Sequence, residues 1–436
     1  MRALWIVALT VLPAACDGSN PTQDAGRALI DADVVDAPSP DARLPNITAQ
    51  IESSRLSACA RSSYGHVRCW GQSQANQAWS GTGACELEFC TVQERPPIVV
   101  GEPALDIALG RSHVCVTLAG SRVLCWGAAG VALGSPSTPA IGDDEPPSDG
   151  VYLQAELPIL DIAAGQEHTC IVMMGGGVHC WGRGAGGVLG YGNEDDQPFD
   201  SGRTLALGEA AIAIEAAEDT TCILTDDGGV KCWGYVPQVV AAEDTIGDTE
   251  TPLATARLDF GGPVSSLSVR SDTICAVRQA DNALYCIGSN DFGALGRGDT
   301  VSRGDPLQPV EVGPVPLAAT VATIEVGQFH VCAVSDVGRV FCWGSGEEGA
   351  LGGGDGAVDF GDDEPIDNIQ PVEVGDDVLS LTSGWAFNCG ITSSGSVRCW
   401  GAGRSNGSFP VINIGDNETP AAVGDVITSW PQSGEF

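Results

Sequence analysis

Basic residues are scarce in this 436-residue chain. It holds 20 Lys and Arg against 57 Asp and Glu, which gives a net charge of −37, and Lys231 is its only lysine. Nucleic-acid binding takes most of its affinity from Lys and Arg that neutralise phosphates, so the composition excludes a nucleic-acid partner. An anionic membrane face would be repelled for the same reason. The charge favours a solvated acidic surface, attraction of cations, or a basic partner.

The apolar stretch near the start is too short to span a bilayer. Residues 3–15 are mostly apolar and follow Met1 and Arg2, whereas a membrane-spanning helix takes about 20 apolar residues. A short basic end followed by a short apolar stretch is typical of a signal peptide, which we expect over residues 1–15.

The residues at the end of this stretch indicate lipidation. Leu12-Pro-Ala-Ala-Cys16 resembles the lipobox of bacterial lipoproteins, in which the cysteine becomes the lipid-modified N-terminus, although Pro13 stands where Leu is usual. We expect lipidation at Cys16, and simple secretion after cleavage near Ala14 or Ala15 is the alternative.

Aromatic residues are absent from residues 17–43, which are rich in Asp, Ala, Pro and Ser. Such a segment cannot bury enough apolar area to offset its chain entropy, so it predicts a flexible tether. The expected organisation is a signal peptide over 1–15, a lipidated Cys16 with an acidic tether over 16–46, and a folded body over 47–436.

Glycine and cysteine are abundant by contrast. The chain has 58 Gly, 26 Pro and 17 Cys. The first two favour many short strands joined by tight turns. In an exported chain, 17 cysteines predict a disulfide framework with one cysteine left over.

Fourteen cysteines recur as seven pairs. The second cysteine opens Cys-Trp-Gly in six copies and Cys286-Ile-Gly in the seventh, and the first cysteines recur every 52 to 57 residues. The predicted disulfides are Cys59–Cys69, Cys115–Cys125, Cys170–Cys180, Cys222–Cys232, Cys275–Cys286, Cys332–Cys342 and Cys389–Cys399. A further pair, Cys85–Cys90, would close a small loop, which leaves Cys16 for lipid.

The segment between each pair has the pattern of a β-hairpin. If Cys332 faces Cys342, Val334 faces Val340, and Gly338 lies in a short loop where positive φ is needed. Residues that face each other on antiparallel strands lie about 4.5–5.5 Å apart, within disulfide range.

Each hairpin is preceded by further strand-like segments. One β-prone run ends just before each hairpin, and a shorter run that starts with proline, such as those at Pro309 and Pro371, comes before that one. About four short strands per repeat, repeated seven times around an axis, predict an all-β seven-bladed β-propeller with one cross-strand disulfide per blade. Residues 48–53 lack the proline-bearing run before them, and residues 419–423 supply one. We therefore expect the C-terminal strand to complete the first blade and close the ring.

The repeat is similar to that of the regulator of chromosome condensation repeat family. The similarity lies in Gly327-Gln-Phe-His330, Trp343-Gly344 and Gly349-Ala-Leu-Gly352, with related runs at 165–168 and 293–296. It covers about residues 47–430 and implies a seven-bladed propeller. The cysteine pairs and acidic loops resemble an exported bacterial branch of the family, and the nuclear role of nucleotide exchange fits neither the charge nor the signal peptide.

Several motifs have the form of chemical sites. The runs at 182–187 and 344–349 match the dinucleotide pattern G-x-G-x-x-G, and residues 403–407 match the nucleophile elbow G-x-S-x-G. They lie in repeat loops without the required strand and helix context, so we interpret them as structural. His113, His168 and His330 stand two residues before a cysteine, and we expect the imidazoles to bond backbone groups and not zinc. The tryptophans after the second cysteines are expected to pack between blades.

A Gly-Asp-x-Glu motif recurs four times and offers candidate calcium ligands. Carboxylates at this density suit Ca²⁺, although Asp and Asn also make good turns. The candidates are Asp143, Glu145, Asp248, Glu250, Asp362, Glu364, Asp416 and Glu418. No other cofactor is expected.

The interpretation that best fits these features is a monomeric, non-catalytic lipoprotein of the cell envelope or surface that binds a protein or glycan ligand. Its least regular loops, at 72–97, 128–150 and 183–204, would make the contacts. One alternative is a propeller-type inhibitor of a secreted hydrolase. A hydrolase or lyase with acid and base groups in the central channel is another.

Overall fold

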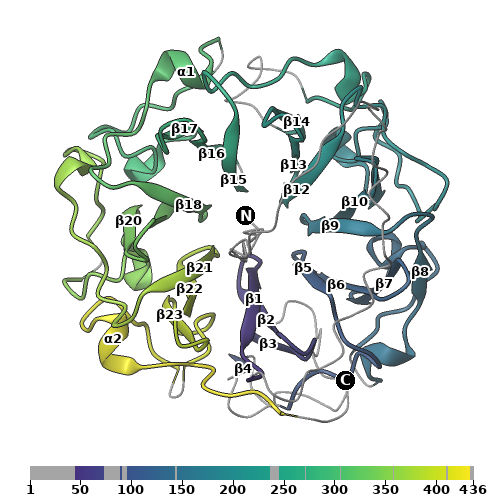
Figure 1. Cartoon of the computed structure of the whole chain (residues 1–436), viewed down its shortest axis with the longest axis horizontal. Helices are drawn as coiled ribbons and strands as arrows, with labels where there is room; N and C mark the ends of the chain where they lie inside the picture. Colours follow the sequence, from purple (N-terminus) through teal and green to yellow (C-terminus); the bar gives the residue numbers. More distant parts are fainter. Residues whose placement is uncertain are drawn as a thin grey trace, which may run out of the picture.

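The computed structural model describes residues 45–72, 96–142, 145–235, 245–270, 272–304, 306–356, 358–408 and 411–432, and the backbone of residues 89–90. These residues form seven antiparallel sheets arranged around one axis (Figure 1). The predicted seven-bladed β-propeller is therefore confirmed. No helix within these ranges is both long and apolar enough to cross a membrane.

Each sheet is one blade, and its strands follow one another from the axis outward. Blade 1 has β1 (Thr48–Ser53), β2 (Ser57–Ser62), β3 (Val67–Gln72) and β4 (Phe89–Cys90), and blade 2 has β5 (Asp106–Leu109), β6 (His113–Leu118), β7 (Arg122–Gly127) and β8 (Tyr152–Gln154). Blade 3 has β9 (Ile159–Ala164), β10 (His168–Met173) and β11 (Val178–Gly182), and blade 4 has β12 (Ala211–Ala217), β13 (Thr220–Thr225) and β14 (Val230–Gly234). Blade 5 has β15 (Val264–Arg270), β16 (Thr273–Arg278) and β17 (Leu284–Gly288), and blade 6 has β18 (Val321–Val326), β19 (His330–Ser335) and β20 (Val340–Gly344). Blade 7 has β21 (Val378–Ser383), β22 (Phe387–Thr392) and β23 (Val397–Gly401).

The helices of the described residues are short segments in the connections between strands. The α-helices are α1 (Pro309–Val312) and α2 (Pro420–Val423), and the 3₁₀ helices are η2 (Val131–Leu133), η3 (Pro147–Asp149), η4 (Ala185–Gly187), η5 (Pro252–Ala254), η6 (Asp291–Gly293), η7 (Glu347–Gly349) and η8 (Ile366–Asn368).

The cysteine pairs set the register of each hairpin. Cys332 lies opposite Cys342 and Val334 opposite Val340, and Gly338 has φ +78°. All seven predicted blade disulfides are present, with Cα–Cα distances between 4.0 and 4.2 Å. Cys16, Cys85 and the side chain of Cys90 lie outside the described residues, so the remaining cysteine predictions stay predictions.

The prediction for the proline-bearing runs is wrong. Pro309 and Pro420 begin α1 and α2, and Val372 bonds β20 of the blade that precedes it in the chain. Each run thus leads to, or forms, the outer segment of the blade just completed, because that segment pairs with the free edge of the third strand. The C-terminal segment does the same, since Ile427 bridges Val397 of blade 7 and not blade 1.

The ring still closes through the C-terminal segment. Trp430 Nε1 donates to Thr48 Oγ1 at 3.0 Å, and Asn46 donates to the carbonyl of Pro431 at 2.6 Å. Blades 1 and 7 also meet directly, because the Ser53 hydroxyl donates to the carbonyl of Ser383 at 2.7 Å. The segment therefore leaves blade 7 and fastens onto blade 1 (yellow in Figure 1).

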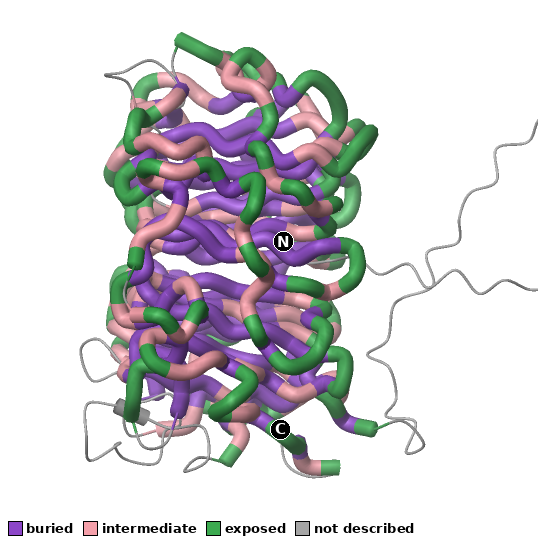
Figure 2. Tube along the Cα trace, turned by 90° about the vertical axis from the view of Figure 1, so that its left-hand side faces the viewer, coloured by how far each residue is buried: buried purple, intermediate pink, exposed green. Residues whose placement is uncertain are grey.

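The core lies between neighbouring blades, in clusters of buried residues that each span two or three of them. Figure 2 shows buried segments throughout the thickness of the disc and exposed ones mainly at its two faces. The six tryptophans of Cys-Trp-Gly are all less than 2% exposed. In four of them the indole N–H donates to a carbonyl of the preceding blade, as Trp343 does to Ala294 at 2.8 Å. The expected packing of these rings between blades is confirmed.

Candidate functional site

The antiparallel order of the strands divides the connections between two faces. Turns between first and second strands, and loops that follow third strands, lie on one face, which we call the loop face. The hairpins between second and third strands lie on the other, which we call the hairpin face. The loops at 72–97, 128–150 and 183–204 all follow third strands, so they start from the loop face. Two of them then reach the hairpin ends of their blades, because Leu205 bonds Val178 at the start of β11 and Ile98 bridges Val67 at the start of β3.

The Gly-Asp-x-Glu motifs dock neighbouring blades on the loop face. Gly192, Gly298 and Gly354 each donate a backbone N–H to the motif glycine of the next blade, at 2.9 to 3.0 Å. The backbones approach so closely that a Cβ on Gly187 would lie 2.4 Å from the amide nitrogen of Asp248. The recurrence of the motif therefore has a structural cause.

The calcium candidates are distributed over separate blades. Asp143 lies outside the described residues, and the others occupy loops of blades 2, 4, 6 and 7. Two of them serve their own loops, since Asp248 accepts from Thr245 at 2.7 Å and Glu364 from the amide of Gly361 at 3.4 Å. Within the described ranges, one metal-sized group of three acidic side chains is found, Asp362, Asp363 and Glu364. Calcium binding stays a prediction.

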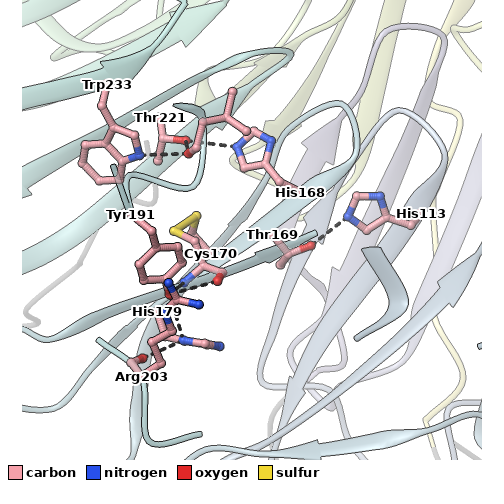
Figure 3. Close-up of a disulfide and its surroundings, with 11 residues drawn as sticks. His113, His168, Thr169, Cys170, His179, Tyr191, Arg203, Thr221 and Trp233 are labelled. Atoms are coloured by element: carbon pink, nitrogen blue, oxygen red, sulfur yellow. Dashed lines mark hydrogen bonds between the residues drawn. A yellow bond between two sulfur atoms is a disulfide. The ribbon is translucent and has the colours of Figure 1, made fainter. Parts of the chain in front are cut away.

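The three histidines before cysteines connect consecutive blades. His168 Nε2 bonds Thr221 Oγ1 of the next blade at 3.0 Å, and His113 bonds Thr169 in the same way at 2.8 Å (Figure 3). His330 bonds Asn388 at 2.9 Å. The prediction of a structural role fits this geometry. Each Nε2 bonds a side chain of the following blade, where backbone groups were expected, and His113 also has a backbone hydrogen bond with His168.

A glycine makes room for each of these rings. A Cβ on Gly165 would lie 2.1 Å from the ring of His168, so only glycine fits there. Burial lowers the pKa of His168 to about 3 and that of His113 and His330 to about 4, so all three are neutral near pH 7. The run Gly-Gln-x-His is thus a unit of blade packing.

The motifs that resemble cofactor and nucleophile sites have other surroundings. The glycine runs lead into η4 and η7, which are single 3₁₀ turns and not the helix that a pyrophosphate site needs. Ser405 of the G-x-S-x-G run is fully buried. Its hydroxyl is therefore closed to a substrate.

Loop 183–204 is held by an aromatic cluster on blade 3. The Tyr191 hydroxyl donates to the carbonyl of Cys180 at 3.0 Å, and Arg203 lies 3.8 Å above the Tyr191 ring (Figure 3). His179 Nδ1 shares a hydrogen bond with the same hydroxyl, and the His179 ring packs edge-on against Phe199. Burial raises the pKa of Tyr191 to about 12. The loop is an ordered part of the surface.

The axis of the ring is a polar channel of about 530 Å³. Glu52, Glu215 and Glu325 line it, each directly opposite the first cysteine of its hairpin. Burial raises the pKa of Glu325, and the charge of Glu215 adds to the effect. Sequence reasoning missed this ring of carboxylates, although the repeated Ile-Glu pairs could have revealed it.

Arg270 crosses the channel near the loop face. Its Nη2 donates to the carbonyl of Ser383 in blade 7 at 2.8 Å, and its Nε donates to the carbonyl of Val326 in blade 6 at 3.2 Å. Burial lowers the pKa of Arg270, and the charges of Glu218 and Glu325 oppose this shift. One arginine of blade 5 thus ties three blades together at the channel mouth.

Aromatic side chains are exposed on the loop face. Tyr235 is 49% exposed, and Phe292 is 43% exposed and packs edge-on against Phe329 of blade 6. Arg55 of blade 1 stacks on Trp385 of blade 7, with 4.2 Å between guanidinium carbon and ring centre. An exposed set of aromatic and charged groups is typical of protein-binding surfaces.

The repeats have relatives among known proteins. Residues 281–334 and 321–350 match family models of the regulator of chromosome condensation (RCC1) repeat. The ultraviolet-B receptor UVR8 of Arabidopsis thaliana is 27% identical over 319 residues, which are 72% of this chain and 67% of that protein. The human E3 ubiquitin-protein ligase HERC2 is 27% identical over 217 residues, 45% of this chain but only 4% of the ligase.

Solved propellers of this kind share the fold. Yeast Prp20 (RCC1) bound to Kap60 superposes with a TM-score of 0.62 at 16% identity, over 96% of this chain and 91% of that one. Human WBSCR16 gives 0.61 at 18% identity, over 78% of this chain and 85% of that one. The chain therefore shares the fold of these propellers, and its residues 281–350 match the RCC1 repeat.

Proposed function

We propose that this protein is a non-catalytic interaction scaffold of the cell envelope, held at a membrane through a lipidated Cys16, and that its loop face binds a protein partner. The observation that carries the proposal is the exposed aromatic and charged set of the loop face. RCC1-like propellers support a protein-binding role, since yeast Prp20 has been crystallised with Kap60 and described for its binding to Gsp1p and histones.

The charge of the chain indicates the kind of partner. A net charge of −37 attracts a basic surface from a distance and raises its association rate at low salt. Association should therefore slow as salt is added. A secreted hydrolase with a basic surface, held as an inhibitor holds its target, is one such partner.

Photo-crosslinking in the producing cells tests the binding face. A photoreactive amino acid replaces Tyr235 on the loop face or, as the matched control, Val337, which is 63% exposed in a turn of the hairpin face. We expect a discrete adduct of higher mass from position 235 and none from 337. Equal adducts from both positions, or none from 235, would contradict the proposal.

The anchor is tested separately. Cys16→Ser should release the protein from the membrane fraction and abolish incorporation of an alkyne-tagged fatty acid. Retention of both in the variant would refute lipidation at this residue.

A channel enzyme is a second candidate function, because Glu325 lies among other carboxylates with a raised pKa. Such a hydrolase or lyase would lose its activity on envelope glycans in the Glu325→Gln variant. Equal activity of the parent protein and the variant would exclude Glu325 as the catalytic acid.

A further inference from the structure

Equivalent clefts open on the loop face between blades 3 and 4 and between blades 5 and 6. The first, of about 420 Å³, is lined by Glu167, Arg183 and Gly186. The second, of about 60 Å³, is lined by Asp272, Ser289 and Asp291, with Phe329 beside it. The repeat places Asp272 where the first cleft has Glu167.

One carboxylate of the first cleft, Glu167, is paired with an arginine of the same blade. Arg183 Nη1 lies 2.8 Å from Glu167 Oε2, and this contact raises the pKa of Arg183. Ser289 stands in the place of Arg183 in the second cleft, and none of the described residues lining that cleft is basic. Burial raises the pKa of Asp272, and the charges of Glu218 and Asp291 add to the effect.

Two phenylalanines stand at the second cleft, where the first has Tyr235: Phe329 lines the cleft and Phe292 packs against it. Phe292 stands where blade 3 has Gly186, in a left-handed backbone at φ +58° that a bulky residue rarely adopts. Its ring centre lies 5.4 Å from that of Phe329, and 43% of its surface stays exposed. In the next blade Glu348 occupies this place at φ +55° and holds Arg404 at 2.6 Å.

We propose that the cleft between blades 5 and 6 takes an arginine side chain of a partner protein, with the guanidinium beside Asp272 and Asp291 and against the Phe292 ring. The fold supplies this cation itself in the first cleft, through Arg183, and none of the described residues lining the second cleft supplies it. An aromatic face next to carboxylates suits a planar cation. This inference rests on the proposed function and names the chemistry that one part of the loop face recognises.

A peptide titration tests the cleft. The probe is the capped peptide Gly-Gly-Arg-Gly-Gly, followed by ligand-observed NMR with the full chain, and the same peptide with citrulline for arginine is the neutral control. We expect Ser289→Arg to abolish binding, because the new side chain would pair with Asp272 as Arg183 pairs with Glu167. Phe292→Gly should weaken binding at least about fivefold, and Gly suits the left-handed backbone, so folding should not suffer.

Asp362→Asn is the matched control for S289R, since it changes the net charge by the same +1 in an acidic loop of another blade. Its Kd should stay within about twofold of the parent value, as expected for a contribution of overall charge alone. Equal Kd values for the parent, S289R and F292G, or equal binding of the citrulline peptide, would overturn the inference. If the arginine peptide does not bind but photo-crosslinking still gives a loop-face adduct, the inference about the cleft is rejected and the proposed function is not. If the peptide binds but no adduct forms, the proposed function is rejected.

Discussion

At the residue scale, the buried histidines between blades, His113, His168 and His330, should make the ring sensitive to acid. Each has a folded pKa near 3 or 4, below the ordinary value of 6.5, because burial disfavours the imidazolium. The unfolded chain therefore binds more protons than the folded one. The contribution of the neutral histidines to the free energy of unfolding is complete above about pH 6.5 and is lost as the pH falls toward about 4.

We expect the free energy of unfolding to fall over this window by up to about 1.4 kcal/mol per pH unit for each histidine. Urea unfolding at several pH values measures it. His168→Gln keeps a hydrogen-bonding group but cannot be charged, so its curve should be flatter than that of the parent. Parallel curves would show that His168 does not contribute.

Lys231 offers a second prediction for a single side chain. It is 3% exposed, and its ammonium lies 3.3 Å from Glu209 and bonds the carbonyl of Leu207. An amine-reactive ester should leave Lys231 unmodified in the native protein and modify it fully in concentrated guanidinium. Peptide mapping distinguishes the two states. Equal modification in both would contradict the buried ion pair.

Some residues of the candidate site could not be predicted from sequence. The spacing of His330 predicted its structural role, but its partner Asn388 is 58 residues away and is identified only by how blades stack. Phe292 was missed because Gly186 and Glu348 occupy the same position in other repeats, so no residue type is characteristic of that position. Backbone conformation is what these three residues share.

At the element scale, the hairpin is the unit that the sequence predicts best. A cysteine pair, a glycine turn and alternating valines are all local, so they set the register of β19 on β20 without knowledge of the ring. The outer segment depends instead on which strand edge is free in space. That is why the run at Pro371 predicted a strand but was assigned to the wrong blade.

The disulfide of a single blade should be worth a measurable part of the stability. Cys332→Ala with Cys342→Ala removes a bridge that closes a short loop, and should lower the free energy of unfolding by about 2–3 kcal/mol. Equilibrium unfolding in urea gives this difference. Both sulfurs are buried, so a reductant should reach them in the native protein only as the blade opens.

A bridge reduced at the same rate in the native and the denatured protein would contradict that burial. The cysteine pair of blade 3 serves as the matched control, because its sequence separation is also 10 residues. Its removal should lower stability by a similar amount if the constraint of the unfolded chain is the main cause.

At the scale of the whole molecule, one interface of the ring lies between blades that do not follow one another in the chain. Six interfaces lie between blades that follow one another in the chain, and the seventh brings blade 7 against blade 1. There Arg68 lies 5.0 Å above the Trp430 ring, and Trp430 bonds Thr48. The C-terminal segment thus has a role that none of the internal outer segments has.

A chain that ends at Gly424 should therefore lose far more stability than its length suggests. It leaves Val397 without the bridge to Ile427, exposes the edge of β23, and removes the buried Trp430 from the interface. Loss of a buried tryptophan alone costs about 3–5 kcal/mol, and a free strand edge favours association with other chains. We expect a lower Tm and oligomers in size-exclusion chromatography, whereas a chain that ends at Gln432 should keep the parent Tm and elution volume. If the chain ending at Gly424 matched the longer one in both measurements, the packing of blade 1 on blade 7 would be sufficient to close the ring.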